Sequence, residues 1–345
     1  MLDPLVFEPY FRPQVWGHQR LASILGKPLP AGARIGESWE VSGHPHHFSR
    51  VAAGPWAGRS LAELWTEERR RLMGVDAPEQ FPLLVKFLDC HKPLSVQVHP
   101  SDEFAAQAAS RDSGKTEAWF VVRADPGARI YAGFQAGVTR REVEQRLAAG
   151  TLPECLHSFE PRAGQAVFVP AGIVHALGGG VLLAEVQQSS DATYRLFDWN
   201  RVGLDGRPRE LQVDLALSAI NWQAGPVQPV EPTAIARLEA ASVARLVDCD
   251  YFTWNRWELA APLRQHGGCI GIWMIVGGQG RLHVPTTGYV RKFTIGETVL
   301  IPADCRGWIW EPAGFMTAVC ITPKAAPSKS QASNERARSR DSIAA

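Results

Sequence analysis

The sequence predicts a mostly β fold made of two related antiparallel barrels of the jelly-roll type, with a small helical portion. Aromatic and β-branched residues gather in short runs bounded by turn formers, among them many of the 31 glycines and 25 prolines. Helical signals are fewer and do not alternate with the strands, which argues against a doubly wound parallel sheet. An internal repeat relates the two halves of the chain and indicates two barrels.

Seven of these runs predict strands, because each is rich in aromatic and β-branched residues and lies between turn-forming residues. They are Glu117–Arg123, Arg129–Phe134, Ala166–Val169, Val181–Val186, Gly271–Val276, Thr298–Ile301 and Met316–Ile321. The run Gly178–Gly180 precedes the fourth strand and predicts a tight hairpin turn.

Helices are predicted where a capping pair precedes a helical pattern. Ser60 and Glu63 form one such pair, and Thr139 and Glu142 form another. We expect helices over Leu61–Met73, from Thr139 to a stop at Gly150, and over Asp214–Trp222.

The internal repeat consists of two pairs of matching segments. Residues 164–171 (GQAVFVPA) match 296–303 (GETVLIPA), and 117–122 (EAWFVV) match 271–276 (GIWMIV). The first copy is longer between its segments, and the helix before Gly150 accounts for much of the difference. Because both copies combine a tryptophan-bearing strand with a strand that ends in Pro-Ala, we interpret them as two related barrels.

The two copies differ at positions that could bind a metal. Glu117 and His175 of the first copy correspond to Gly271 and Gly307 of the second. A barrel that lacks both groups cannot build the same site, so we expect any chemistry in the first copy and a structural role for the second.

The segment from Ser95 to His99 supplies two more candidate ligands. Side chains alternate between the two faces of a strand, so Gln97 and His99 point the same way as Ser95. Together with Glu117 and His175 they offer two imidazoles, a carboxylate and an amide oxygen. This set suits one divalent first-row ion per chain, Zn²⁺ first, with other metals of that row possible.

Composition narrows the function further. The chain has 36 Lys and Arg against 35 Asp and Glu, a net charge of +1, which is not typical of a nucleic-acid or anionic-membrane partner. No apolar run approaches the length of a membrane span, and the N-terminus lacks the features of a signal peptide. Six scattered cysteines suit reduced thiols. We expect a cytoplasmic protein that acts on a small molecule, and the oligomeric state stays open.

Seven ordered motifs resemble the type I mannose-6-phosphate isomerases, in particular the shorter bacterial form. The motifs are 16–17 (WG), 35–42 (IGESWEVS), 81–89 (FPLLVKFLD), 93–100 (PLSVQVHP), 114–119 (GKTEAW), 170–176 (PAGIVHA) and 188–195 (QSSDATYR). The resemblance implies a zinc-dependent enzyme of the cupin superfamily that interconverts mannose 6-phosphate and fructose 6-phosphate through an enediol or enediolate. It also implies that Gln97, His99, Glu117 and His175 hold the metal and that Arg195 is catalytic.

The resemblance leads to an expected division of the chain. Residues 1–225 would form the catalytic metal-binding domain with helical insertions, and 226–323 a metal-free cupin-like barrel. Residues 324–345 are rich in Ser, Ala and basic residues and contain almost no large apolar ones, so we expect a disordered tail.

The expected reaction needs a proton shuttle, a stabiliser for enediolate oxygens and a cationic cradle for phosphate. Lys115 lies two residues before Glu117 and is a candidate base. Arg195 offers a planar fork of donors for a phosphate or an enediolate. Lys86, Ser95 and Trp39 are further candidates for binding the substrate.

Two other functions stay open. A metal-binding cupin could act as a non-catalytic sensor of sugar phosphates, because such a barrel can keep ligand binding after losing turnover. The ligand types also tolerate Fe²⁺, which would allow an iron-dependent redox enzyme that uses O₂.

Overall fold

The computed structural model describes residues 1–108, 110 and 112–325, so all but the first two residues of the predicted tail, 324–345, lie outside the described residues. Helices and one 3₁₀ segment connect the strands. They are α1 (Arg20–Ser23), α2 (Leu61–Leu72), α3 (Asp102–Gln107), α4 (Arg140–Ala149), η1 (Leu152–Cys155) and α5 (Val213–Ala219).

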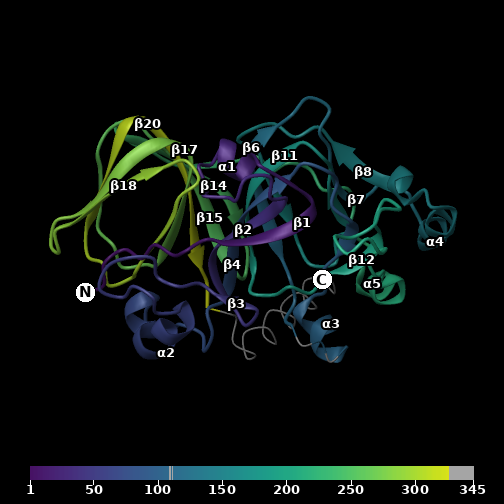
Figure 1. The fold of residues 1–345 in the computed structure, drawn as a ribbon, viewed down its shortest axis with the longest axis horizontal. Helices are drawn as coiled ribbons and strands as arrows, with labels where there is room; N and C mark the ends of the chain where they lie inside the picture. Colours follow the sequence, from purple (N-terminus) through teal and green to yellow (C-terminus); the bar gives the residue numbers. More distant parts are fainter. Residues whose placement is uncertain (109, 111, 326–345) are drawn as a thin grey trace, which may run out of the picture.

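Strands make up most of the regular structure, so the prediction of a mostly β fold is confirmed (Figure 1). The strands are β1 (Tyr10–His18), β2 (Ile35–His44), β3 (His47–Phe48), β4 (Leu83–Cys90), β5 (Val96–Val98), β6 (Glu117–Ala124), β7 (Ile130–Phe134), β8 (Leu156–Phe159), β9 (Ala166–Val169), β10 (His175–Leu177), β11 (Val181–Gln188), β12 (Tyr194–Phe197), β13 (Thr233–Arg237), β14 (Ala241–Asp248), β15 (Phe252–Leu259), β16 (Leu263–Gln265), β17 (Gly271–Val284), β18 (Tyr289–Thr294), β19 (Thr298–Ile301) and β20 (Trp308–Pro323).

The strands form three sheets. The first has seven strands, in the order β1-β2-β4-β11-β6-β9 with β3 added on β2, and the second has five, in the order β12-β5-β10-β7-β8. An eight-stranded sheet contains β13 to β20. Figure 1 shows this C-terminal sheet, in green and yellow, beside the strands of the first half.

The internal repeat is visible in the strand register. Trp119 of β6 pairs with Val167 of β9, and Trp273 of β17 pairs with Val299 of β19. These four residues occupy matching positions in the two aligned sequence segments. The two copies therefore use the same pairing of a tryptophan-bearing strand with a Pro-ended strand.

The predicted capping residues do cap two helices, α2 and α4. The Ser60 side chain accepts from the Glu63 backbone while the Glu63 carboxylate accepts from Ser60, so the capping box before α2 is complete. The Thr139 side chain caps α4, and Gly150 ends that helix with a φ of +71°, which favours glycine.

Two local predictions were wrong. The helix expected over Asp214–Trp222 ends at Ala219, because Ile220 is extended and Trp222 instead stacks on Phe134 with a centroid separation of 5.6 Å. The run Gly178–Gly180 is not a hairpin turn. It carries the chain from β10 in the five-stranded sheet to β11 in the seven-stranded sheet.

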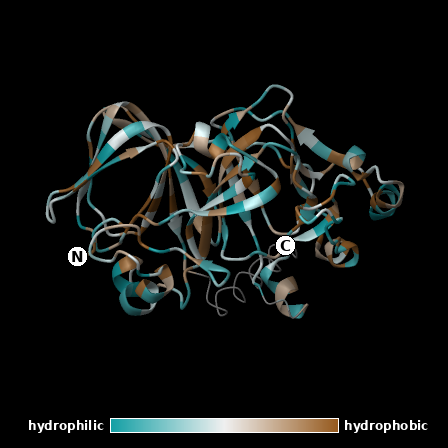
Figure 2. Ribbon diagram, in the orientation of Figure 1, coloured by the Kyte–Doolittle hydropathy of each residue, from teal (hydrophilic) through white to brown (hydrophobic). Residues whose placement is uncertain are grey.

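A shared apolar core joins the two halves of the molecule. Val85 and Phe87 of β4 belong to one buried cluster with Trp254, Ile272 and Val319 of the eight-stranded sheet. Figure 2 shows hydrophobic strand segments in brown across the middle of the molecule. The alternate residues of β4 face the opposite way, toward the space between the seven- and five-stranded sheets.

None of the helices in the described part of the chain is long and apolar enough to cross a membrane.

A buried ion pair lies beside this core, and its contribution to stability can be measured. Lys27 Nζ lies 2.6 Å from Glu40 Oε2, near the ring of Phe87, and both side chains are buried. Glu40→Gln should lower the free energy of unfolding by about 3 kcal/mol, because it leaves the Lys27 charge buried without its counter-charge. Thermal and urea unfolding would measure the loss.

Replacing both partners by apolar residues, Lys27→Met with Glu40→Leu, should recover most of that stability. Glu160→Gln changes an exposed carboxylate in the same way and serves as the control. A Glu40→Gln variant as stable as this control would contradict the interpretation.

Candidate metal centre and active site

Two rows of side chains face each other across the space between the seven- and five-stranded sheets. In the five-stranded sheet, Arg195 pairs with Gln97, and Gln97 pairs with His175. Directly paired residues of antiparallel strands point to the same face. The short strands β12, β5 and β10 therefore place a guanidinium, an amide and an imidazole side by side.

The seven-stranded sheet contributes the opposite row. Trp39 pairs with Lys86, Lys86 with Glu185 and Glu185 with Trp119. Glu117 precedes Trp119 by two residues on β6 and so shares its face. These strands bring a carboxylate toward the imidazole row and a Lys–Glu pair beside it.

His99, Glu117 and His175 form a buried cluster that could hold a metal ion. One ligand atom from each lies within 4.8 Å of the others. His99 Nε2 is 3.3 Å from Glu117 Oε2, and His175 Nε2 is 3.4 Å from Glu117 Oε1. The Gln97 amide nitrogen is 3.4 Å and 3.3 Å from the same two imidazole nitrogens. The structure thus brings all four predicted ligands together.

Hydrogen bonds on the far side of each ring orient the two imidazoles. His99 Nδ1 lies 2.7 Å from the carbonyl oxygen of Ala192, and His175 Nδ1 lies 2.9 Å from that of Ile173. When Nδ1 donates to these carbonyls, each Nε2 keeps a free lone pair. Burial and the Lys115 charge lower the pKa of His99 to about 3, and burial lowers the pKa of His175. Both rings are therefore neutral near pH 7, as metal ligands must be.

The Glu117 carboxylate suits a cation for two reasons. Burial would raise its pKa, but the neighbouring Lys115 charge outweighs that effect and holds the pKa well below its usual range. Its Oε2 atom is buried and accepts no well-aligned hydrogen bond from the described residues. An ionised, under-coordinated carboxylate between two neutral imidazoles is the donor set expected for a divalent first-row ion.

Lys115 lies at the edge of this cluster and is buried rather than solvated. Its Nζ atom is 2.9 Å from His99 Nε2 and 2.9 Å from Glu117 Oε2. It also lines the neighbouring pocket. The ammonium group is therefore in contact with the candidate ligands and with the space in which a substrate would lie.

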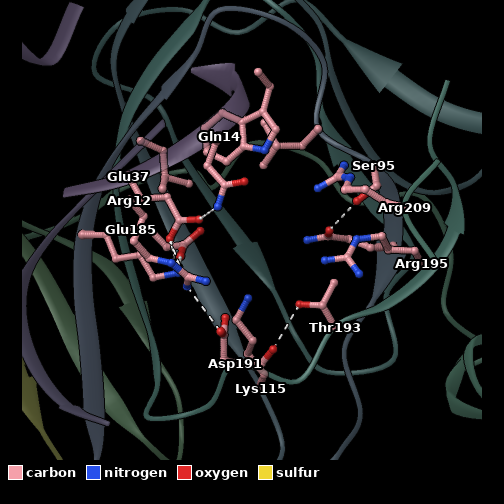
Figure 3. A pocket seen from close by; sticks show the side chains of 15 residues that line it. Arg12, Gln14, Glu37, Ser95, Lys115, Glu185, Asp191, Thr193, Arg195 and Arg209 are labelled. Atoms are coloured by element: carbon pink, nitrogen blue, oxygen red, sulfur yellow. Dashed lines mark hydrogen bonds and ion pairs between the residues drawn. The ribbon is translucent and has the colours of Figure 1, made fainter. Parts of the chain in front are cut away.

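The pocket beside the cluster has a basic wall, formed by Arg195 and Arg209 with the hydroxyl groups of Ser95 and Thr193 nearby (Figure 3). Asp198 holds Arg209 through bonds of 2.7 Å and 2.6 Å. The Nε atom of Arg195 is buried and has no hydrogen-bond partner among the described residues. The Arg195 guanidinium thus keeps an unpaired donor beside the pocket, which suits an anion.

The facing wall carries a charge network around Lys86. Its Nζ lies 3.0 Å from Glu185 Oε1 and 3.7 Å from Glu37 Oε2. Burial alone would lower the pKa of Lys86, but Glu185 and Glu37 outweigh it and raise the pKa. Arg12 and Asp191 extend this network, with 3.3 Å between their charged groups. Figure 3 shows Arg12, Glu37 and Glu185 of this network opposite Arg195 and Arg209.

Trp39 does not belong to the pocket lining that contains Lys86 and Ser95. It is buried behind the lining, where its Nε1 donates to Glu37 at 2.7 Å and its ring lies 5.6 Å from Lys86 Nζ. The structure therefore places Trp39 as a support for two lining side chains.

Several lining residues were missed by sequence reasoning. Asp191 lies inside the motif at 188–195, but nothing in the sequence indicates which residues it contacts. Arg12 and Arg209 lie outside any quoted motif and reach the pocket only through the fold. Neither arginine has a distinguishing sequence pattern around it, and arginines are common on any protein surface.

Comparisons with known proteins show the family to which the chain is similar. Residues 5–118 match the family model of the phosphomannose isomerase type I catalytic domain. A mannose-6-phosphate isomerase of Bacillus subtilis is 35% identical over 302 residues, covering 87% of this chain and 93% of that protein. One from Streptococcus mutans is 34% identical over 311 residues, covering 89% of this chain and 95% of that protein.

A solved structure agrees as well. The crystal structure of the mannose 6-phosphate isomerase from Bacillus subtilis aligns with a TM-score of 0.85 at 29% identity, over 93% of this chain and 99% of the other. Since identity above 30% extends over most of the chain, the protein belongs to the type I family of mannose-6-phosphate isomerases.

Proposed function

We propose that this protein is an aldose–ketose isomerase that interconverts mannose 6-phosphate and fructose 6-phosphate with one Zn²⁺ per chain. The observation that carries the proposal is the position of two neutral imidazoles and an ionised carboxylate beside a pocket that has a basic wall. Family membership supports the substrate. The free thiols of all six cysteines, which lie in the described part of the chain, fit the cytoplasm.

Gln97, His99, Glu117 and His175 would hold the metal. The Gln97 side chain would offer its amide oxygen, which at present accepts from Ser95 at 3.0 Å. When bound, the ion would act as a Lewis acid that stabilises negative charge on a substrate oxygen.

The remaining chemistry is assigned to the pocket side chains. In its neutral amine form, Lys115 would take the proton from C2 of mannose 6-phosphate and return it to C1 of the resulting enediol or enediolate, while the hydroxyl proton of O2 moves to O1. Arg195 and Arg209, with Ser95, would hold the phosphate or an enediolate oxygen, because their donors face the pocket. Lys86, supported by Trp39, would contact substrate hydroxyl groups from the facing wall. Five basic and three acidic side chains line the pocket, an excess that suits a dianionic substrate.

The activity is tested by incubating the purified protein with mannose 6-phosphate without oxygen and measuring fructose 6-phosphate. We expect turnover that a chelator abolishes and Zn²⁺ restores. A shift in melting temperature without product would instead support a sensor. Oxygen consumption in an aerated sample would support an iron-dependent redox enzyme.

His175→Ala should lose both the metal and the activity, because it removes one of two imidazole donors from a buried site. Metal content of the dialysed protein and the initial rate are the measurements. His266→Ala removes an exposed imidazole and is the matched control. Full metal content in His175→Ala would remove this residue from the ligand set.

Arg195→Lys keeps the positive charge but loses the planar fork, so turnover should fall by about a hundredfold, a cost of about 2 to 3 kcal/mol, with the metal retained. Steady-state kinetics and metal analysis measure this. Arg281→Lys, at a largely exposed side chain, is the control. Near-normal turnover in Arg195→Lys would contradict the assignment.

A further inference from the structure

A tyrosine hydroxyl of the C-terminal half bonds to a carboxylate that also holds the segment carrying Lys115. Tyr251 lies in the turn between β14 and β15, and its Oη donates to Asp102 Oδ2 at 2.7 Å. Asp102 is the first residue of α3, which belongs to the first half of the molecule. This hydrogen bond therefore links the metal-free C-terminal sheet to the neighbourhood of the candidate active site.

The Asp102 carboxylate also accepts hydrogen bonds from two further groups. Its Oδ1 atom accepts from the backbone N–H of Gly114 at 2.8 Å, and both of its oxygens lie near Gln188 Nε2, at 3.2 Å and 3.3 Å. Gln188 in turn accepts from the backbone N–H of Thr116 at 2.8 Å. The residues on both sides of Lys115 are thus held by side chains that meet at Asp102.

The backbone of this segment has little freedom to move. The Lys115 N–H donates to the carbonyl oxygen of Pro100 at 3.0 Å, so three successive N–H groups are bound. A Cβ atom at Gly114 would lie 2.4 Å from the Asp102 nitrogen, so only glycine permits this approach. The segment packs directly against the start of α3.

Lys115 needs such a fixed backbone because its ammonium group has two short contacts, at 2.9 Å each, with His99 and Glu117. A long lysine side chain has many rotamers, and a shift of its Cα moves Nζ away from these partners. The position of the proposed proton carrier therefore depends on the hydrogen bonds that fix Gly114 and Thr116.

From these contacts we propose that the eight-stranded sheet sets the position of Lys115, with Tyr251, Asp102 and Gln188 as positioning residues. Tyr251 anchors Asp102 from the C-terminal sheet, and Asp102 and Gln188 hold the backbone on either side of the lysine. The catalytic part of this proposal rests on the proposed isomerase function. In this proposal the C-terminal sheet, which contains the second copy of the repeat and lacks the metal ligands, helps to position a catalytic side chain of the first copy.

The test is Tyr251→Phe in the full-length protein loaded with zinc. We expect kcat to fall about fivefold, the value of one hydrogen bond of about 1 kcal/mol, with KM within twofold of the wild type. Zinc content and melting temperature should be unchanged. Tyr289→Phe removes a hydroxyl from the same sheet away from this contact, and it should behave as the wild type.

Hydrogen exchange gives a second readout that does not depend on activity. The peptide covering Ser113–Glu117 should exchange faster in Tyr251→Phe than in Tyr289→Phe, with other peptides unchanged. If Tyr251→Phe does not fold, Asp102→Asn takes its place, with the same expected changes.

Each other outcome overturns a defined part of the proposal. Wild-type kcat in Tyr251→Phe overturns the positioning role, even if exchange is faster. A lower kcat with unchanged exchange shows that the hydroxyl does not act through this segment. A wild-type protein without turnover overturns the isomerase function, while the exchange comparison still decides whether Tyr251 holds the segment.

Discussion

The candidate site depends on keeping buried charges next to opposite charges. An ionised group between two sheets loses its hydration, and only a close partner with good geometry compensates for that loss. Glu117 lies against Lys115, Lys86 against Glu185, and Arg209 against Asp198. The last two pairs join different strands or loops, so they fix the spacing of the elements that carry the catalytic candidates.

Much of the site could be predicted because its signals are local. Alternation along a strand placed Gln97 and His99 on one face, and both lie in the cluster with Glu117 and His175. The comparison of two repeat copies singled out the last two residues. Capping residues located α2 and α4 for the same reason, since a cap acts within a few residues of the helix that it begins or ends.

The remaining features could not be predicted because they depend on the fold as a whole. Arg12 and Arg209 reach the pocket from segments far from the quoted motifs. The glycines at 178–180 have the composition of a hairpin turn, and only the partners of β10 and β11 show that they join two sheets. Trp222 leaves a helical pattern because a ring on another element, Phe134, offers a better contact. Packing outweighed local preference at each of these places.

The strand β11 has one face in the pocket and the other in the core shared with the C-terminal sheet. Glu185 and Gln187 point inward, while Ala184 and Val186 belong to the shared apolar cluster. An excised first half would therefore present a sheet face of bare aliphatic and aromatic groups to water, and such a surface favours self-association. Each half therefore relies on the other to keep this shared face out of water.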